Sequence, residues 1–86
     1  EAVPNPFNPS TRIHFALAVP GMARVTIYDV AGRRVAVLLD EHREAGSHAI
    51  VWEGRDDGGR QAPSGLYFYR LDADGYSETK RMTLIK

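Results

Sequence analysis

The stretch RVTIYDVAGRRVAVLLD, residues 24–40, holds two runs of alternating apolar and polar residues with a turn signal between them. Val25 and Ile27 share one face of the first run, and Val37 takes the equivalent face of the second. A period of two indicates strands with one buried face. Gly32 supplies the positive φ that a tight hairpin favours. The stretch therefore predicts an antiparallel hairpin.

The same alternation recurs along the whole chain. Further strands are expected over residues 12–17, 48–54, 66–73 and 76–86. Asp74-Gly75 is a favoured two-residue turn between the last two strands. RDDGGRQAPSG, residues 55–65, is the strongest loop signal. The pattern gives six strands, or seven if residues 1–4 add an edge, and it supports no helix.

Short strands with turn signals every 8–12 residues are typical of a β-sandwich or a small barrel. A chain of 86 residues with six or seven strands suits two packed antiparallel sheets, so we expect a sandwich. Trp52, the single tryptophan, is expected at its centre. The remaining predicted core consists of Phe15, Leu17, Val25, Ile27, Val37, Ile50, Tyr67, Tyr69, Leu71, Met82 and Leu84.

Composition removes several classes of function. Eleven basic residues balance eleven acidic ones, so no net charge draws the molecule to nucleic acid or to an anionic membrane. The absence of cysteine excludes disulfides, thiolate zinc sites and thiol catalysis. No apolar run approaches the roughly 20 residues that span a bilayer.

The residues that could carry chemistry do not form a recognisable site. His14, His42 and His48 lack metal-ligand spacing, and Ser47 adjoins His48 on a strand, where neighbours point to opposite faces. Residues 56–59 lack the alternating oxygen ligands and closing glutamate of a calcium loop, which favours ordinary turn residues. We therefore expect no catalytic, metal or cofactor site.

Two other features leave alternatives open. Tyr67 and Tyr69 could form a sugar-binding platform if they were exposed, but alternation with Phe68 places one of the two sets in the core. The strand over residues 80–86 combines cations with an apolar stripe, which suits pairing with the edge of a receptor sheet. Lysines also protect ordinary edge strands from aggregation, so these residues alone do not decide the matter.

Four segments taken together resemble one family. They are PNPFNPSTRIHFAL (4–17), VTIYDVAGRRVAVL (25–38), AGSHAIVWEGRDDGGRQAPSGLYFYRL (45–71) and KRMTLIK (80–86). In order and spacing the set is similar to the type A C-terminal sorting domain of the bacterial type IX secretion system. It is also similar to the related immunoglobulin-like domain of the flagellar hook-capping protein.

The resemblance implies an immunoglobulin-like sandwich with Greek-key connections and no catalytic activity. It implies a boundary segment at residues 1–10 and a single domain at residues 11–86, placed after an exported cargo domain. The family motif falls on Pro4, Asn5, Pro6, Gly65 and Tyr67, and the structural core includes Phe15, Ile27, Ile50, Trp52 and Tyr69. The recognition residues would be Lys80, Arg81, Met82, Thr83, Leu84, Ile85 and Lys86.

A sorting domain would take its cargo through the periplasm to the cell surface or beyond. Its partners would be the outer-membrane translocon and a surface peptidase, with no nucleic acid and no membrane span of its own. The long GRDDGGRQ loop, residues 54–61, departs from the simplest sorting domains and leans toward the hook-cap relative. A structural or accessory domain on a secreted enzyme is therefore the main alternative, and a carbohydrate-binding module is the third.

Overall fold

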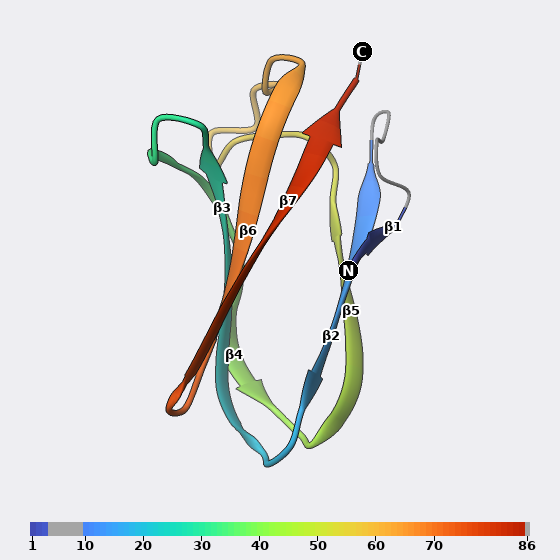
Figure 1. Cartoon of the computed structure of the whole chain (residues 1–86), viewed down its shortest axis with the longest axis vertical. Helices are drawn as coiled ribbons and strands as arrows, with labels where there is room; N and C mark the ends of the chain where they lie inside the picture. The colour runs from blue at the N-terminus through green and yellow to red at the C-terminus, as the bar shows by residue number, and fades with distance from the viewer. Residues whose placement is uncertain (4–9, 86) are drawn as a thin grey trace.

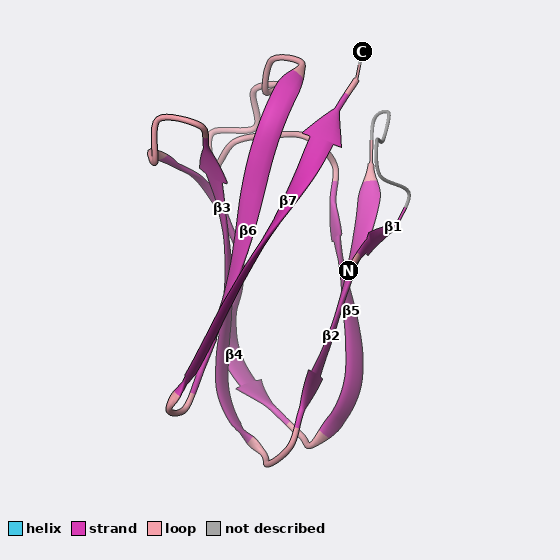
Figure 2. Cartoon of the chain, in the orientation of Figure 1, coloured by secondary structure: helices cyan, strands magenta, loops and turns pink. Residues whose placement is uncertain are grey.

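The computed structural model describes residues 1–3 and 10–85, and this part of the chain is built from strands and loops (Figures 1 and 2). The strands are β1 (Ala2–Val3), β2 (Thr11–Leu17), β3 (Gly21–Asp29), β4 (Arg34–Arg43), β5 (Gly46–Trp52), β6 (Gly65–Ala73) and β7 (Tyr76–Leu84). The described residues include no helix, and so none that could cross a membrane. The prediction of an all-β fold is confirmed.

Two antiparallel sheets face each other. One has the strand order β1-β2-β5 and the other β4-β3-β6-β7. These orders match strands A-B-E and C′-C-F-G of immunoglobulin-like sandwiches. From β3 the chain passes through β4 to β5 in the facing sheet, and β6 then returns to pair with β3. That return is the Greek-key connection expected from the sequence.

The two predicted hairpins are present. Gly32 lies between β3 and β4 with φ of 82°, and Gly75 lies between β6 and β7 with φ of 70°. Both values fall in the left-handed region that glycine enters without steric cost. Glycine at these positions therefore sets where each strand pair turns.

Strand β4 departs from the regular alternation that the sequence predicted. Val25 of β3 pairs with Leu39, but the next residue of β3 pairs with Val37, so Leu38 is left without a partner. An extra residue of this kind, a β-bulge, reverses which side chains point inward beyond it. Ala36 and Leu39 are consequently buried, and the prediction that Val37 lies in the core was wrong.

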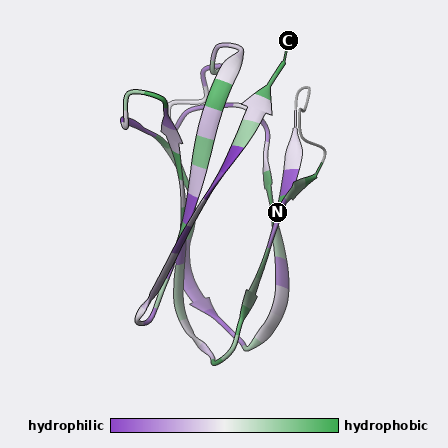
Figure 3. Ribbon diagram, in the orientation of Figure 1, coloured by the Kyte–Doolittle hydropathy of each residue, from purple (hydrophilic) through white to green (hydrophobic). Residues whose placement is uncertain are grey.

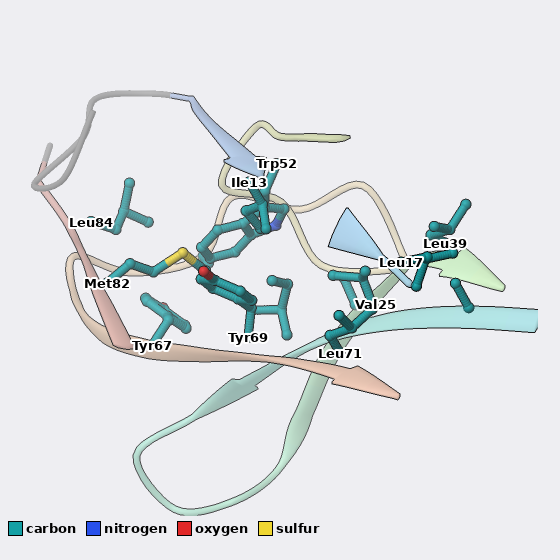
Figure 4. Packing of buried hydrophobic residues seen from close by; sticks show 14 residues of the cluster. Ile13, Leu17, Val25, Leu39, Trp52, Tyr67, Tyr69, Leu71, Met82 and Leu84 are labelled. Atoms are coloured by element: carbon teal, nitrogen blue, oxygen red, sulfur yellow. The ribbon is translucent and has the colours of Figure 1, made fainter. Parts of the chain in front are cut away.

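The core lies between the sheets. Figure 4 shows Ile13 and Trp52 of the three-stranded sheet facing Tyr69 and Met82 of the other. The buried hydrophobic residues are Ile13, Leu17, Ala23, Val25, Ile27, Ala36, Leu39, Trp52, Ala62, Tyr67, Tyr69, Leu71, Met82 and Leu84. Along β6, Tyr67, Tyr69 and Leu71 are buried and alternate with residues that are not, as a strand with one buried face requires. Figure 3 shows that hydropathy also changes from residue to residue along this strand, although the buried tyrosines are not its most hydrophobic residues.

Phe15 and Ile50 are only partly buried, although both were expected in the core. Each packs against the core from a position near the border of the three-stranded sheet. β5 is an edge strand, and β1 is too short to cover β2 beyond His14. The narrow sheet therefore leaves both side chains in contact with solvent.

Strand β1 belongs to the sandwich. Ala2 pairs with Ile13 and Val3 with Arg12, so residues 2–3 of the segment assigned to a boundary take part in a sheet. Residues 4–9 of that segment lie outside the described residues. The boundary at residue 10 stays a prediction.

Replacing Ile27 by alanine should lower the free energy of unfolding by about 2–5 kcal/mol, because it opens a cavity around a fully buried side chain on the central strand β3. Urea denaturation followed by far-ultraviolet circular dichroism measures the loss. Val51→Ala is the matched control, since that side chain is exposed and should change stability by no more than about 0.5 kcal/mol. Equal losses in the two variants would contradict the assigned faces.

Candidate functional site

The strand that carries the predicted recognition residues, β7, lies at the edge of the four-stranded sheet. It pairs with β6, and no described strand pairs with its other side. Figure 1 shows it running toward the end of the molecule that carries the β3–β4 turn and the β5–β6 connection. Among the described residues, β7 is thus an edge strand, the position in a sheet at which strand pairing with another chain takes place.

The structure separates the side chains of this strand. Met82 and Leu84 are buried in the domain's own core, whereas Arg81 and Thr83 alternate onto the outer face. The Lys80 ammonium lies 3.5 Å from Glu78 Oε1. The apolar stripe predicted from the sequence is therefore not offered to a partner as a unit.

Beyond β7, Ile85 is 47% exposed. Lys86 lies outside the described residues, as do Pro4, Asn5 and Pro6 of the family motif. A partner that binds along the edge of β7 would contact the Arg81 side chain and Ile85 in addition to the strand backbone.

The other two motif residues stand at the start of β6. Gly65 opens the strand with φ of 153°, a conformation that L side chains rarely adopt. Tyr67 is buried, and its hydroxyl donates a 2.6 Å hydrogen bond to the carbonyl oxygen of Pro63. A tyrosine near the start of strand F that bonds back to the preceding backbone is the tyrosine corner of immunoglobulin-like sandwiches.

Trp52 anchors the other end of the same connection. Its ring meets Tyr67 edge to face, with centroids 5.1 Å apart and planes at 67°. Its indole N–H donates to the carbonyl oxygen of Arg55 at 2.9 Å. The two aromatic residues thus hold both ends of the β5–β6 connection while burying their rings in the core.

The sequence Asp-x-x-Gly-Arg occurs twice, as DVAGR (29–33) and DDGGR (56–60), and both copies form the same turn. Their glycines, Gly32 and Gly59, share φ of 82°. In each copy the aspartate amide donates to the arginine carbonyl oxygen, at 3.0 Å in the first and 2.9 Å in the second. The identical spacing could have revealed this repeat from the sequence, but it was not recognised there.

Each aspartate carboxylate is fully engaged within its turn. One oxygen of Asp29 accepts the N–H groups of Ala31 and Arg33, both at 3.0 Å, and the other accepts Arg33 Nε at 3.1 Å. Asp56 receives the equivalent bonds, including Arg60 N–H at 3.0 Å and Arg60 Nε at 3.2 Å. In both, the backbone N–H of the arginine is the largest cause that lowers the carboxyl pKa.

The second turn docks on the strand that follows the first. The amide of Asp57 donates to the carbonyl oxygen of Val35 at 3.1 Å, and the Asp57 carboxylate accepts the amide of Val37 at 3.0 Å. A groove of about 590 Å³ lies between the turns. Arg33 and Arg60 border it with side chains 81% and 84% exposed.

These contacts bear on the chemistry of the loop. The oxygens of Asp56 and one oxygen of Asp57 are already hydrogen-bonded within the fold, which accounts for them as turn residues. Within residues 1–3 and 10–85, no three histidine, aspartate or glutamate residues cluster as metal ligands would. The arrangement is suited to holding a rigid surface loop.

The tyrosines do not form the exposed row that a sugar platform requires. Tyr67 and Tyr69 are buried, and Tyr28 is half-buried on the opposite face of the sheet. Tyr76 is 49% exposed, but it follows the turn at the other end of β6. The sugar-binding alternative thus loses the feature on which it depended.

A model of the FlgD Ig-like domain family matches residues 6–76. The chain belongs to this family. The match includes Trp52, Tyr67 and both Asp-x-x-Gly-Arg turns, and it ends at Tyr76, the first residue of β7. Membership in the FlgD Ig-like family therefore rests on the body of the sandwich and not on the terminal strand. No curated protein matches the chain.

Solved structures extend the likeness to β7. Dimeric latent PorU from Porphyromonas gingivalis has a TM-score of 0.78 and 22% identity over 99% of this chain. PorZ, a surface component of the type IX secretion system of the same organism, has a TM-score of 0.69 and 24% sequence identity over the full length of this chain. FlgD from P. aeruginosa has a TM-score of 0.69 and 26% sequence identity over 86% of this chain. This FlgD-type domain spans 9%, 11% and 58% of the lengths of PorU, PorZ and FlgD.

Two tyrosines of this FlgD-type domain should respond oppositely to removal of the hydroxyl. Tyr67→Phe should cost about 1 kcal/mol, because it deletes the bond to Pro63. Tyr69 is buried, and its hydroxyl has no hydrogen-bond partner among the described residues, so Tyr69→Phe should leave stability unchanged or raise it by up to about 1 kcal/mol. Chemical denaturation at pH 7 compares the two, and a larger loss in Tyr69→Phe would contradict this assignment.

Tyr69 should also weaken the domain at high pH. Burial, followed by the charges of Glu78 and Glu1, raises the pKa of Tyr69 to about 12. The ordinary tyrosine pKa in the unfolded chain is about 10. The folded state therefore favours the protonated phenol, and this contribution to stability is lost as pH rises from 10 through about 12. Tyr69→Phe should remove that part of the alkaline loss.

The two aspartate turns provide controls for each other. Nuclear magnetic resonance titration should give carboxyl pKa values for Asp29 and Asp56 below the ordinary value of 3.8. Arg60→Ala should raise the pKa of Asp56 only part of the way back, since the backbone N–H at position 60 remains, and should leave Asp29 unchanged. Arg33→Ala should raise the pKa of Asp29 part of the way back and should leave the pKa of Asp56 unchanged.

The depressed carboxyl pKa values of Asp29 and Asp56 make the stability of the domain depend on pH in the acid range. Both turns stabilise the fold above the unfolded aspartate pKa and lose that contribution as pH falls through the folded values, below about 3.8. Equal shifts of both aspartates in either variant would show that the turns are not independent units.

Proposed function

We propose that this domain is a non-catalytic sorting module that directs an exported cargo protein through the type IX outer-membrane translocon. The observation that carries the proposal is the position of β7 at the edge of the four-stranded sheet, as the described residues show it, with Arg81 on its outer face. Edge strands of this kind recognise partners by strand addition. The likeness to PorZ, which extends over the full chain, supports the same function.

The remaining assignments belong to the same proposal. The partners are the outer-membrane secretion machinery and its surface peptidase, and the cargo precedes the domain in a longer chain. The cargo crosses the periplasm and reaches the cell surface or the medium. Lack of catalysis is supported by the engagement of Asp29 and Asp56 in their own turns, which leaves no arranged acid–base pair there.

A second function is an accessory or spacer domain, as in an assembly of the hook-capping type. The family match favours it, because the match ends where β7 begins. The docked loop over residues 54–61, with its second aspartate turn, also suits a domain whose task is mechanical. The two functions differ in one respect: a sorting module requires another protein to bind the edge of β7, and an accessory domain does not.

A secretion assay distinguishes these functions. Deleting residues 80–86 would be ambiguous, because Met82 and Leu84 belong to the core and their loss would unfold the domain. The test therefore uses the surface variant Arg81→Glu/Ile85→Asp, with the domain fused behind an exported reporter enzyme in a bacterium that has a type IX system. The reporter at the cell surface should fall about tenfold, as expected for a loss of roughly 1.4 kcal/mol in binding.

The matched control is Arg24→Glu/Val51→Asp, which makes the same chemical changes at exposed positions away from β7. It should be secreted like the unaltered fusion, and thermal denaturation of both purified variants confirms that they fold. Normal surface display of the β7 variant would refute recognition at this edge. Retention of the unaltered fusion in the periplasm would support the accessory function.

A further inference from the structure

Strand β1 covers only part of the outer edge of β2. Glu1 is the last residue along this edge: its amine donates to the carbonyl oxygen of His14 at 2.9 Å, and the His14 amide donates to Glu1 at 2.7 Å. Beyond this pair, residues 15–17 of β2 have β5 on one side and no described strand on the other. Among the described strands, this part of the β2 edge therefore lies uncovered where β1 would continue if it were longer.

The register of β1 fixes what would come next. Glu1 and His14 exchange both backbone hydrogen bonds, and in an antiparallel pair such exchanges recur at every second residue. The residue two before Glu1 would therefore exchange bonds with Ala16. The residue immediately before Glu1 would lie opposite Phe15, and the third would lie opposite Leu17.

The free amine of Glu1 stands where a peptide N–H would stand in a continuing strand. Partial burial, and then the charge of Lys80, lower the pKa of this amine. A peptide N–H at this position would make the same bond to the carbonyl oxygen of His14.

The space beside this edge is suited to side chains of an added strand. A hollow of about 400 Å³ reaches from β2 to β7 and is bordered by Phe15, Leu71, Tyr76, Glu78 and Lys80. Phe15 and Leu71 are apolar, and Glu78 and Lys80 pair with each other at its rim. A small apolar or β-branched side chain opposite Phe15 would cover that ring from solvent.

We propose that residues preceding Glu1 in a longer chain continue β1 as an extended strand along residues 15–17 of β2. The occupant is this upstream segment because the β1–β2 pairing already sets its direction and register. Its first and third residues, counted back from Glu1, face inward over the hollow, and its second faces outward beside His14 and Ala16. The connection to whatever precedes the domain is then fixed on the sandwich and does not act as a swivel.

This inference does not depend on secretion, since it concerns the pairing of one edge. A sorting module and a spacer domain would both gain from it, because a covered edge no longer invites strand pairing with other chains. In either case the upstream protein would leave the domain along the side of β2.

The test compares three forms of the chain: residues 1–86 as they stand, the same chain preceded by Val-Thr-Val, and the same chain preceded by Val-Pro-Val. Proline at the middle position removes the N–H that would donate to the Ala16 carbonyl oxygen, one of the two bonds exchanged with Ala16, and so disfavours the strand pairing that would protect the Ala16 amide, while length and charge stay matched. Hydrogen exchange of the Ala16 amide, followed by nuclear magnetic resonance, is the measurement. The Val-Thr-Val form should protect this amide about tenfold more than the other two, the change that one net backbone hydrogen bond can give.

Equal exchange of Ala16 in all three forms would overturn the proposal. Protection that rises with protein concentration in the chain without an extension would also overturn it, because a second copy would then be the occupant of the edge. The Arg12 amide, which faces Val3 of β1 in every form, is the internal reference and should not change.

Discussion

The contact between Trp52 and Tyr67 joins the two sheets and fixes the path between them. Trp52 ends β5 in one sheet, and Tyr67 lies near the start of β6 in the other, so their edge-to-face contact spans the sandwich. Both side chains also donate a hydrogen bond to the backbone of the connection, Trp52 to the carbonyl oxygen of Arg55 and Tyr67 to that of Pro63. Such a ring pair contributes about 0.5–1.5 kcal/mol beyond burial. Its larger effect is to anchor a long loop so that the second aspartate turn can dock on β4.

Much of the fold was predictable because strand periodicity and glycine turns are local signals. The hairpin around Gly32, the turn at Gly75 and the inward faces of β3 and β6 follow from residues a few positions apart. The bulge at Leu38 was not predictable in this way, since it depends on how β3 and β4 pair. The partial exposure of Phe15 and Ile50 depends on the width of a sheet, which alternation along a single strand does not encode.

The candidate site was less predictable for the same reason. The sequence predicted Met82 and Leu84 both as core residues and, with Ile85, as an apolar recognition stripe; the structure confirms the core position of the first two and leaves Ile85 beyond the strand. The repeat of Asp-x-x-Gly-Arg was visible in the letters. Its meaning needed the structure, which shows that both carboxylates bond to the backbone and guanidinium of their own turns.

The remaining asymmetry of the sandwich lies in its edges. Among the described residues, the three-stranded sheet ends at a two-residue β1 and the four-stranded sheet at a nine-residue β7, so the two sheets have edge strands of very different length. A partner that adds to β7 must read a folded edge, because the apolar side chains of that strand are committed to the core. Recognition would then depend on backbone pairing and a few outward side chains, and it would report that the domain has folded. The neighbouring β2 edge would serve the chain's own upstream segment, which keeps the two edges from competing for the same partner.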